Sequence, residues 1–332
     1  MHGGTFGIAT PRVPLTPALS PGGEGDMPLV KSLPAHPDRK KGAAMTADIL
    51  FQVLVSGLLI GLIYALVAVG LTLIFGVMDI VNFAHGEFLM LGMYASFWAF
   101  ALFAIDPIVA LPLTALLLFA VGVIVYQTVI RRILKAPMLS QIFATFGLMI
   151  LLRGLAQFFW KPDHRLIPHS LVSGNVAFGP VQFGLPQFVA ALGAVGVTGA
   201  LWMFLHRTRL GTALEATAID REAATLMGID GQKMFALAWG IGAACAGLAG
   251  GLIATFFPIF PEVGSNFILI AFVVVVLGGF GSVTGAFLAG IIVGLIEVLG
   301  GFLVGPEYKT AIVLSLLLIV LLVRPRGLLG KA

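Results

Sequence analysis

The sequence has little charge and almost no cysteine. Only 10% of its 332 residues are Asp, Glu, Lys or Arg, against roughly a quarter in soluble domains. This scarcity excludes an ordinary soluble globular protein. The single Cys245 excludes a disulfide within the chain. No basic run alternates with aromatic residues, so the formal net charge of +4 does not predict a nucleic-acid partner.

Motifs for catalysis and for nucleotide binding are missing as well. The sequence has no nucleophile elbow, no His pair spaced for a zinc-binding helix and no cysteine pair. Residues 278–285, GGFGSVTG, are rich in glycine but lack the lysine that a phosphate-binding loop places beside ATP. We therefore expect no enzyme activity, no metal or cofactor site, and no ATP hydrolysis by this chain alone.

Long apolar segments dominate instead. Hydrophobic residue types make up 59% of the chain, and a helix needs about 20 apolar residues to cross a bilayer. The sequence predicts an all-α fold, a polytopic membrane helix bundle with about eight to ten transmembrane helices. At about this length the chain divides into about nine apolar segments: 50–77, 88–105, 107–130, 138–159, 185–205, 234–256, 266–280, 285–302 and 310–323.

Glycine is abundant, with 42 residues. Small residues let membrane helices approach closely when they are spaced four apart. Four pairs have this spacing: Gly57/Gly61, Gly247/Gly251, Gly281/Gly285 and Gly290/Gly294. The glycines of 278–285 mark either a turn or a break within a helix.

The first 44 residues differ from the rest. They are rich in proline, glycine and charge, and contain no apolar run long enough for a signal peptide or a span. We expect residues 1–44 to be disordered, or to be an extension that arises from a start codon assigned too far upstream. Met45 begins an ordinary first membrane segment, so residues 45–332 are expected to form the membrane domain.

Basic residues in the short loops predict the orientation. One side of the membrane receives the Lys and Arg residues of 131–135, 207–233 and 324–331. The other side receives only three: Lys161, Arg165 and Lys309. Since cytoplasmic loops carry the excess of Lys and Arg, the first side is predicted to be cytoplasmic, and with it the C-terminus.

Residues 211–228, GTALEATAIDREAATLMG, form a polar connection between two spans on the predicted cytoplasmic side. Asp220 is placed to cap a helix, Glu222 suits the positive end of the helix dipole, and Gly228 offers a left-handed stop. We predict a short helix from about Arg221 to Met227. A helix this short is marginal in water, so we expect it to dock on another protein. A solvated connector with one capped turn is the alternative.

A second polar segment lies between the first two spans and contains Asn82, His85 and Glu87. Ionisable residues at membrane depth are costly, and they usually lie inside the bundle or beside a water-filled path. These three residues are our candidates for the translocation path. A cytoplasmic turn, or hydrogen bonds from Asn82 and His85 to neighbouring helices, explains the same pattern.

Three segments carry a resemblance to a known family. EATAIDREAATLMGID, at 215–230, resembles the cytoplasmic coupling loop of ABC-importer permeases, specifically the H-type permease of branched-chain amino acid uptake systems. GLIYALVAVGLTLIFGVMDIVNFAHGEFLMLGMY, at 61–94, and AFVVVVLGGFGSVTGAFLAGIIVGLIE, at 271–297, resemble further segments of that family. The resemblance runs in the same order from about Met45 to the C-terminus, so 45–332 is expected to be the permease domain.

The resemblance implies alternating access driven by a separate ATPase, whose cleft receives the cytoplasmic coupling helix. It implies a coupling interface formed by six residues: Glu215, Ala216, Asp220, Arg221, Glu222 and Gly228. It also implies partners: ABC ATPase subunits, a second homologous permease subunit, a substrate-binding protein docked outside on the 160–184 loop, and the lipid bilayer of the bacterial inner membrane.

Two alternatives stay open. An ion-coupled secondary transporter would use Asp79, His85, Glu87 and Glu297 as an ion relay. Within the resembled family, a urea or amide permease would have a similar sequence, since an apolar path does not distinguish these substrates.

Arg153 lies near the outer end of the fourth span, where it is expected to snorkel outward or to pair with Glu297.

Overall fold

The computed structural model describes residues 39–168, 170–179, 181–324 and 327–329. Most of them are helical, and one antiparallel hairpin forms the sheet. The elements are α1 (Arg39–Met78), α2 (His85–Phe103), α3 (Pro107–Val125), the π-helical η1 (Tyr126–Ile130), α4 (Arg131–Ile133), α5 (Met138–Trp160), β1 (Asn175–Phe178), β2 (Val181–Gly184), α6 (Leu185–Arg207), α7 (Arg209–Ile219), α8 (Arg221–Leu226), α9 (Gly231–Ile253), α10 (Val263–Gly278), α11 (Val283–Leu303), the 3-10 turn η2 (Pro306–Tyr308) and α12 (Lys309–Val323).

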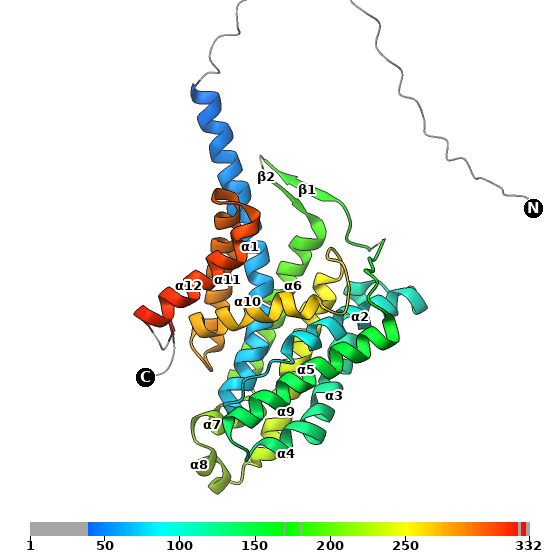
Figure 1. Cartoon of the computed structure of the whole chain (residues 1–332), viewed down its shortest axis with the longest axis vertical. Helices are drawn as coiled ribbons and strands as arrows, with labels where there is room; N and C mark the ends of the chain where they lie inside the picture. The colour runs from blue at the N-terminus through cyan, green and yellow to red at the C-terminus, as the bar shows by residue number, and fades with distance from the viewer. Residues whose placement is uncertain (1–38, 169, 180, 325–326, 330–332) are drawn as a thin grey trace, which may run out of the picture. The chain divides into compact units, whose positions relative to one another are not determined.

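All nine apolar segments predicted from the sequence are helices. Eight helices among the described residues are long and apolar enough to cross a membrane. The ninth, α10, is apolar but has only 16 residues. In Figure 1, α10 runs across the picture at a steep angle to α1. The predicted all-α membrane bundle is confirmed.

α1 begins at Arg39, within the segment 1–44 for which we expected either disorder or an extension from an upstream start codon. Once a helix is nucleated, each added residue brings one backbone hydrogen bond, and the long apolar segment that follows supplies the nucleus. Residues 1–38 lie outside the described part of the chain, as do 325–326 and 330–332.

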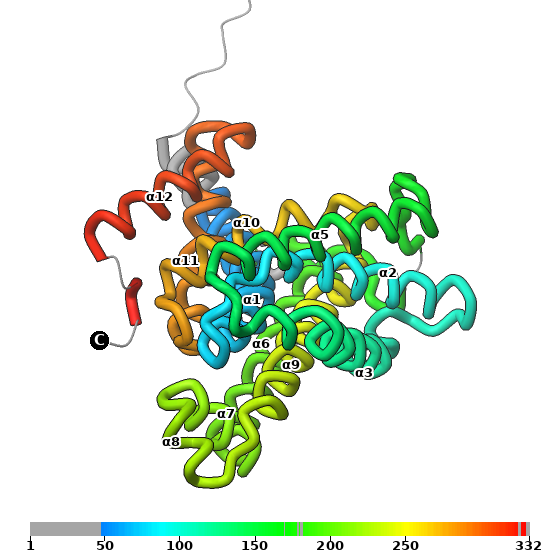
Figure 2. Tube along the Cα trace, turned by 60° about the horizontal axis from the view of Figure 1, so that its bottom comes forward, coloured from blue at the N-terminus to red at the C-terminus, as the bar shows by residue number. Residues whose placement is uncertain are grey.

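The contacts that hold the bundle together fall within the unit from Ala43 to Ala332. In α1 and α9, 78% and 72% of the apolar span is buried, against 6% in the span that contains α12. Figure 2 shows α1 near the centre of the bundle and α12 at its edge. The exposed apolar side chains of the outer helices suit contact with lipid.

Glycines make the closest helix crossings possible. A Cβ on Gly92 of α2 would lie 2.5 Å from the Cα of Gly247 in α9, and one on Gly61 of α1 would lie 2.9 Å from the carbonyl oxygen of Gly290 in α11. No side chain fits at these crossings, so the backbones meet directly. Two of the predicted glycine pairs, Gly57/Gly61 and Gly290/Gly294, lie at such a crossing between α1 and α11; in the pair Gly247/Gly251, a Cβ on Gly251 would meet the side chains of Ser96 and Leu111 instead.

The fourth pair, Gly281/Gly285, does not form a helix face. α10 ends at Gly278 and α11 begins at Val283, so the glycine-rich segment is a turn. Gly281 has a φ of +79°, a conformation that favours glycine. A Cβ on Gly76 of α1 would lie 2.9 Å from the Cα of Gly281. This turn therefore packs directly against α1.

The long loop between α5 and α6 is held in place by Arg165. Its backbone exchanges two hydrogen bonds with Ile259, at 2.9 and 2.8 Å. Its guanidinium lies 5.3 Å from the ring centre of Phe97 and 5.2 Å from that of Trp98, at distances typical of cation–π contacts. The loop is thereby tied to α2 and to the segment before α10.

Candidate functional site

The polar connection between α6 and α9 contains two helices where the sequence predicted one. α7 begins after Thr208, whose hydroxyl accepts a hydrogen bond from the backbone N–H of Gly211 at 3.0 Å. α8 begins after Asp220, whose carboxylate accepts from the N–H groups of Glu222 and Ala223 at 2.9 Å each. The predicted Asp220 cap is confirmed. Figure 1 shows α7 and α8 together at one end of the bundle, which we call the α8 end.

α8 also ends where the sequence predicted. Gly228 has a φ of +82°, and its N–H donates to the carbonyl of Thr225 at 3.0 Å. The N–H of Ile229 donates to the carbonyl of Ala224, also at 3.0 Å. This pair of bonds requires a left-handed residue, which glycine supplies at little cost. Caps at both ends therefore fix the short helix.

α7 was not predicted from the sequence. Its signal is a buried face formed by Gly211, Leu214 and Thr217, spaced three residues apart. A Cβ on Gly211 would clash with the backbone of Phe204 and Leu205, so α7 packs tightly against the end of α6. Three positions are too few to separate a helix from a loop by periodicity alone.

Arg221 links α8 to the end of α1. Its guanidinium donates to the carboxylate of Asp79 at 2.8 Å and to the carbonyl of Val77 at 3.3 Å. It also lies 5.3 Å from the ring centre of Phe235 in α9. Asp79 has a φ of +56°, a conformation that Asp tolerates better than most residues. One side chain of α8 thus contacts two membrane helices.

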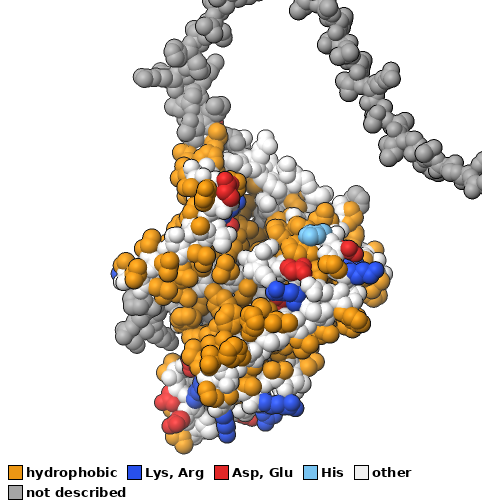
Figure 3. Space-filling model, viewed as in Figure 1, with side chains coloured by type: hydrophobic (Ala, Val, Ile, Leu, Met, Phe, Trp, Pro, Cys, Tyr) orange, Lys and Arg blue, Asp and Glu red, His pale blue; other side chains and the backbone are white. Residues whose placement is uncertain are grey.

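The C-terminal end of α8 exposes two apolar side chains. Leu226 and Met227 are 88% and 82% exposed, while Ala224 on the opposite face is buried. The α8 end is also where Lys and Arg side chains gather in Figure 3, as expected outside the hydrocarbon layer. Apolar side chains exposed to water at such a place commonly mark a contact with another protein.

The six residues of the implied coupling interface differ in exposure. Asp220, Arg221, Glu222 and Gly228 are exposed and belong to α8 or its caps, whereas Glu215 and Ala216 are half-buried in α7. The carboxylate of Glu215 lies 3.6 Å from the Nε2 of His206. The structure therefore brings four of the six together on α8.

Asp230 caps α9 immediately after α8. Its carboxylate accepts from the backbone N–H groups of Gln232 at 3.0 Å and Lys233 at 3.3 Å. The hydrogen bond from the backbone N–H of Lys233 is the main reason why the pKa of the Asp230 carboxyl lies below its usual value. Asp230 therefore keeps its negative charge, and the cap, at neutral pH.

Asn82 and His85 are fully buried, but each bonds to nearby backbone. The Asn82 side-chain oxygen accepts from the N–H of Ala84 at 3.0 Å, which closes the turn before α2. The Nε2 of His85 lies 3.0 Å from the carbonyl oxygen of Val67 in α1. These contacts connect α2 to its turn and to α1.

Glu87 faces a different set of helices. Its carboxylate lies 2.5 Å from the guanidinium of Arg153 in α5, which also donates to the hydroxyl of Ser265 in α10 at 2.6 Å. Glu87 is 1% exposed. The expectation that Arg153 pairs with Glu297 is therefore wrong, because α5 packs against the first turns of α2, where Glu87 is in reach. Glu87, Asn82 and His85 do not converge on one point.

Glu297 lies in α11, in another part of the bundle, where its carboxyl is near the Tyr64 side chain of α1. The four acidic or basic groups of the hypothetical ion relay each have different neighbours. Asp79 contacts Arg221, His85 contacts Val67, Glu87 contacts Arg153, and Glu297 lies near Tyr64. This arrangement does not resemble a continuous proton or ion path.

Comparison with known proteins gives a consistent result. The family model described as "Branched-chain amino acid transport system / permease component" matches residues 53–322. The chain is 35% identical to the high-affinity branched-chain amino acid transport system permease protein BraD of Pseudomonas aeruginosa, over 84% of this chain and 95% of BraD.

Two further relatives cover similar lengths. The chain is 32% identical to LivH of Escherichia coli strain K12, over 84% of this chain and 95% of that protein. It is 29% identical to a probable LivH of Methanocaldococcus jannaschii, over 80% of this chain and 88% of that protein. No solved structure gives a significant match.

Proposed function

The chain belongs to the family of branched-chain amino acid transport permease components, and from this membership we propose that it carries branched-chain amino acids across the membrane as one subunit of an ATP-driven importer. It is a multi-pass protein of the inner membrane, in line with its relatives and its eight long apolar helices. The relatives are named as permease proteins, and no phosphate-binding loop occurs in the sequence. ATP hydrolysis is therefore assigned to a separate subunit.

The contact between Arg221 and Asp79 carries the part of this proposal that concerns coupling to an ATPase. It joins α8, with its exposed Leu226 and Met227, to the end of a helix that runs through the centre of the bundle. A partner that binds α8 and moves can thus displace the end of α1 through this contact. The concentration of basic residues at the α8 end supports a cytoplasmic location for this contact, where ATP is present.

The coupling interface is proposed to consist of Asp220, Arg221, Glu222 and Gly228, with Glu215 and Ala216 in the adjoining α7. Leu226 and Met227 are added, because their exposed apolar area gives an ATPase subunit something to bury. The remaining proposed partners are a second permease subunit and an external substrate-binding protein. The loop fixed by Arg165 lies between spans on the side away from α8, which suits docking of the binding protein.

For Asn82, His85 and Glu87 we propose a structural role in the moving parts. They fasten the start of α2 to its turn, to α1 and to α5. Asp79 begins the same turn, so a movement of α8 that is transmitted through Arg221 would displace this turn and the start of α2. The three residues would then change the translocation path through the positions of the helices, without contacting the cargo.

The experiment is reconstitution into proteoliposomes with candidate ATPase subunits, a second permease and a binding protein from the same organism. Uptake of radiolabelled leucine is expected only when ATP is enclosed on the ATPase side and the binding protein is present outside. Uptake by this chain alone, driven by an ion gradient without ATP, would contradict the proposal and favour a secondary transporter. ATP-driven uptake of urea or an amide in preference to leucine would correct the cargo but leave the coupling intact.

A further inference from the structure

A shallow hollow with basic residues in its wall lies where α6 meets α7. Its volume is about 470 Å³, and its wall is formed by the end of α6, one face of α7 and Ile229, which follows α8. Arg207 and Arg209 belong to this wall, and both are exposed. The fold therefore brings two arginines together at one place on the surface.

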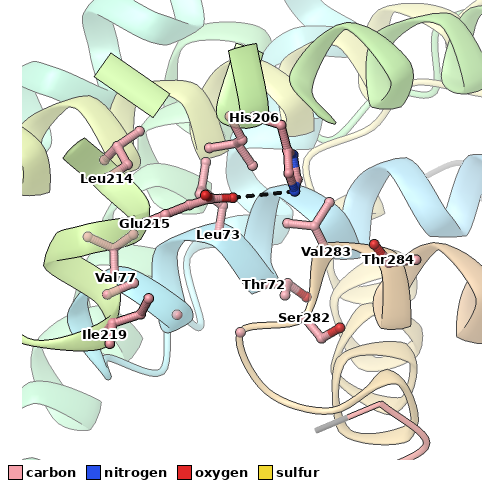
Figure 4. Close-up of a pocket in the computed structure, with 14 residues that line it drawn as sticks. Thr72, Leu73, Val77, His206, Leu214, Glu215, Ile219, Ser282, Val283 and Thr284 are labelled. Atoms are coloured by element: carbon pink, nitrogen blue, oxygen red, sulfur yellow. Dashed lines mark ion pairs between the residues drawn. The ribbon is translucent and has the colours of Figure 1, made fainter. Parts of the chain in front are cut away.

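Neither arginine has a carboxylate partner. None of the ion pairs among the described residues includes Arg207 or Arg209. Glu215, the nearest carboxylate along the chain, is directed toward His206 instead, as Figure 4 shows. The positive charge of the hollow is therefore not neutralised by the part of the chain that the structure describes.

The start of α7 adds to this positive charge. The first backbone N–H groups of a helix have no acceptor within it, and the helix dipole places positive potential there. In α7, which has 11 residues, the Thr208 hydroxyl accepts from the N–H of Gly211, which leaves those of Arg209 and Leu210 for another acceptor. Phosphate oxygens accept several hydrogen bonds at once, from guanidinium groups and from helix N-termini alike.

The hollow lies at the depth of lipid head groups. Trp202 and Met203, in the last turns of α6, are 46% and 59% exposed, and tryptophan is enriched at the boundary between hydrocarbon and water. Arg207 follows Met203 by four residues, which is about 6 Å along a helix. Leu210 is also exposed, beside Arg209. A lipid thus suits this place better than a soluble anion, because it adds apolar contacts to those of its phosphate.

We propose that this hollow binds the phosphate head group of an anionic phospholipid from the leaflet on the α8 side. Arg207, Arg209 and the first N–H groups of α7 hold the phosphate, and the acyl chains lie beside Trp202, Met203 and Leu210. Basic pockets beside membrane helices recognise anionic head groups in this way. The lipid fixes the corner between α6 and α7 at the membrane surface. Because α8 follows α7 directly, it also fixes the base from which α8 moves, a consequence that rests on the proposed function.

The test measures binding of phosphatidylglycerol and phosphatidylcholine to the full chain in detergent by native mass spectrometry, at about 150 mM salt to screen distant charges. The wild type should prefer phosphatidylglycerol by about ten- to thirtyfold in Kd. Arg207→Gln with Arg209→Gln should lose most of this preference. Arg131→Gln with Arg132→Gln is the matched control, because it removes two adjacent, exposed arginines of α4 that lie outside the hollow. This control should keep the preference.

Two further measurements address charge and occupant. Arg207→Lys with Arg209→Lys keeps both charges and should retain most of the preference. Inorganic phosphate in millimolar excess should not displace phosphatidylglycerol, since it lacks the apolar contacts. All pairs of substitutions should leave the melting temperature in phosphatidylcholine unchanged, because the side chains are exposed.

The proposal is overturned if the wild type binds both lipids equally, or if the glutamine pair and the α4 control lose the preference equally. It is also overturned if the lysine pair loses as much as the glutamine pair, or if inorganic phosphate displaces the lipid, which would indicate a soluble anion. Unchanged lipid binding together with loss of the ATPase subunit in the glutamine pair would assign the arginines to a protein interface instead. None of these measurements requires transport, so they decide the hollow even if the proposed function fails.

Discussion

Arg221 of α8 and Asp79 at the end of α1 form an ion pair of 2.8 Å although 142 residues separate them in the sequence. Both side chains are substantially exposed, at 45% and 74%. An exposed pair contributes about 1 kcal/mol or less to folding. Loss of the pair therefore leaves the fold intact, which makes its role in coupling accessible to substitution.

The cap of α8 should matter for the ATPase. Asp220→Ala removes the acceptor of two backbone N–H groups and is expected to destabilise α8 by about 1 kcal/mol. A frayed α8 presents its docking surface less often, so the Kd for the ATPase subunit should rise about three- to tenfold. Asp220→Asn keeps an acceptor oxygen and serves as the control. Equal Kd values for the two variants in a binding assay would contradict this role.

The exposed apolar pair on α8 is expected to be a docking contact. Leu226→Ser combined with Met227→Ser removes apolar surface that is 88% and 82% exposed, so the thermal stability of the isolated chain should not change. Co-purification of the ATPase subunit should decrease strongly. Full retention of the ATPase by this double variant would exclude Leu226 and Met227 from the interface.

A second substitution should restore the stability that is lost when the buried ion pair of Glu87 and Arg153 is broken. Arg153→Met leaves Glu87 buried without its partner, and is expected to destabilise the chain by about 3–5 kcal/mol. Adding Glu87→Gln removes the unpaired charge and should recover most of this loss. Thermal unfolding in detergent measures both variants. A double variant that is no more stable than Arg153→Met would argue against a stabilising ion pair.

Alanine substitutions should destabilise the chain at glycines in close helix crossings but not at glycines on the open helix surface. Gly92→Ala places a methyl group 2.5 Å from the Cα of Gly247 and is expected to destabilise the bundle by about 1–3 kcal/mol. Gly154→Ala is the matched control, since a Cβ there meets nothing within 4 Å and alanine favours the helix. Melting temperatures of the two variants should move in opposite directions. A similar decrease in both would indicate that α2 and α9 are not in close contact.

Sequence patterns predicted the elements whose signals are local. Apolar length predicted nine helices, and the spacing of Asp220 and Gly228 predicted both ends of α8, because capping depends on residues within one turn. The pairing of Arg153 with Glu87 was not predicted. Which helices meet depends on packing across the bundle, and the sequence contains two equivalent carboxylates, Glu87 and Glu297, for one arginine.

The link between Arg221 and Asp79 was also not predicted. It joins segments 142 residues apart in the chain, so no local spacing reports it.

The most direct test of coupling through α8 is a double-mutant cycle on the rate of ATP-driven leucine uptake. Asp79→Asn keeps a residue that tolerates positive φ, and Arg221→Gln keeps much of the side-chain length. Lys233→Gln, which removes the neighbouring exposed pair with Asp230, is the control and should not change the rate.

Each single variant is expected to lower uptake about three- to tenfold while ATPase association and the melting temperature are retained. If the two residues act through their mutual contact, the double variant should transport no more slowly than either single variant. Losses that multiply in the double variant, or single variants with the wild-type rate, would contradict the account.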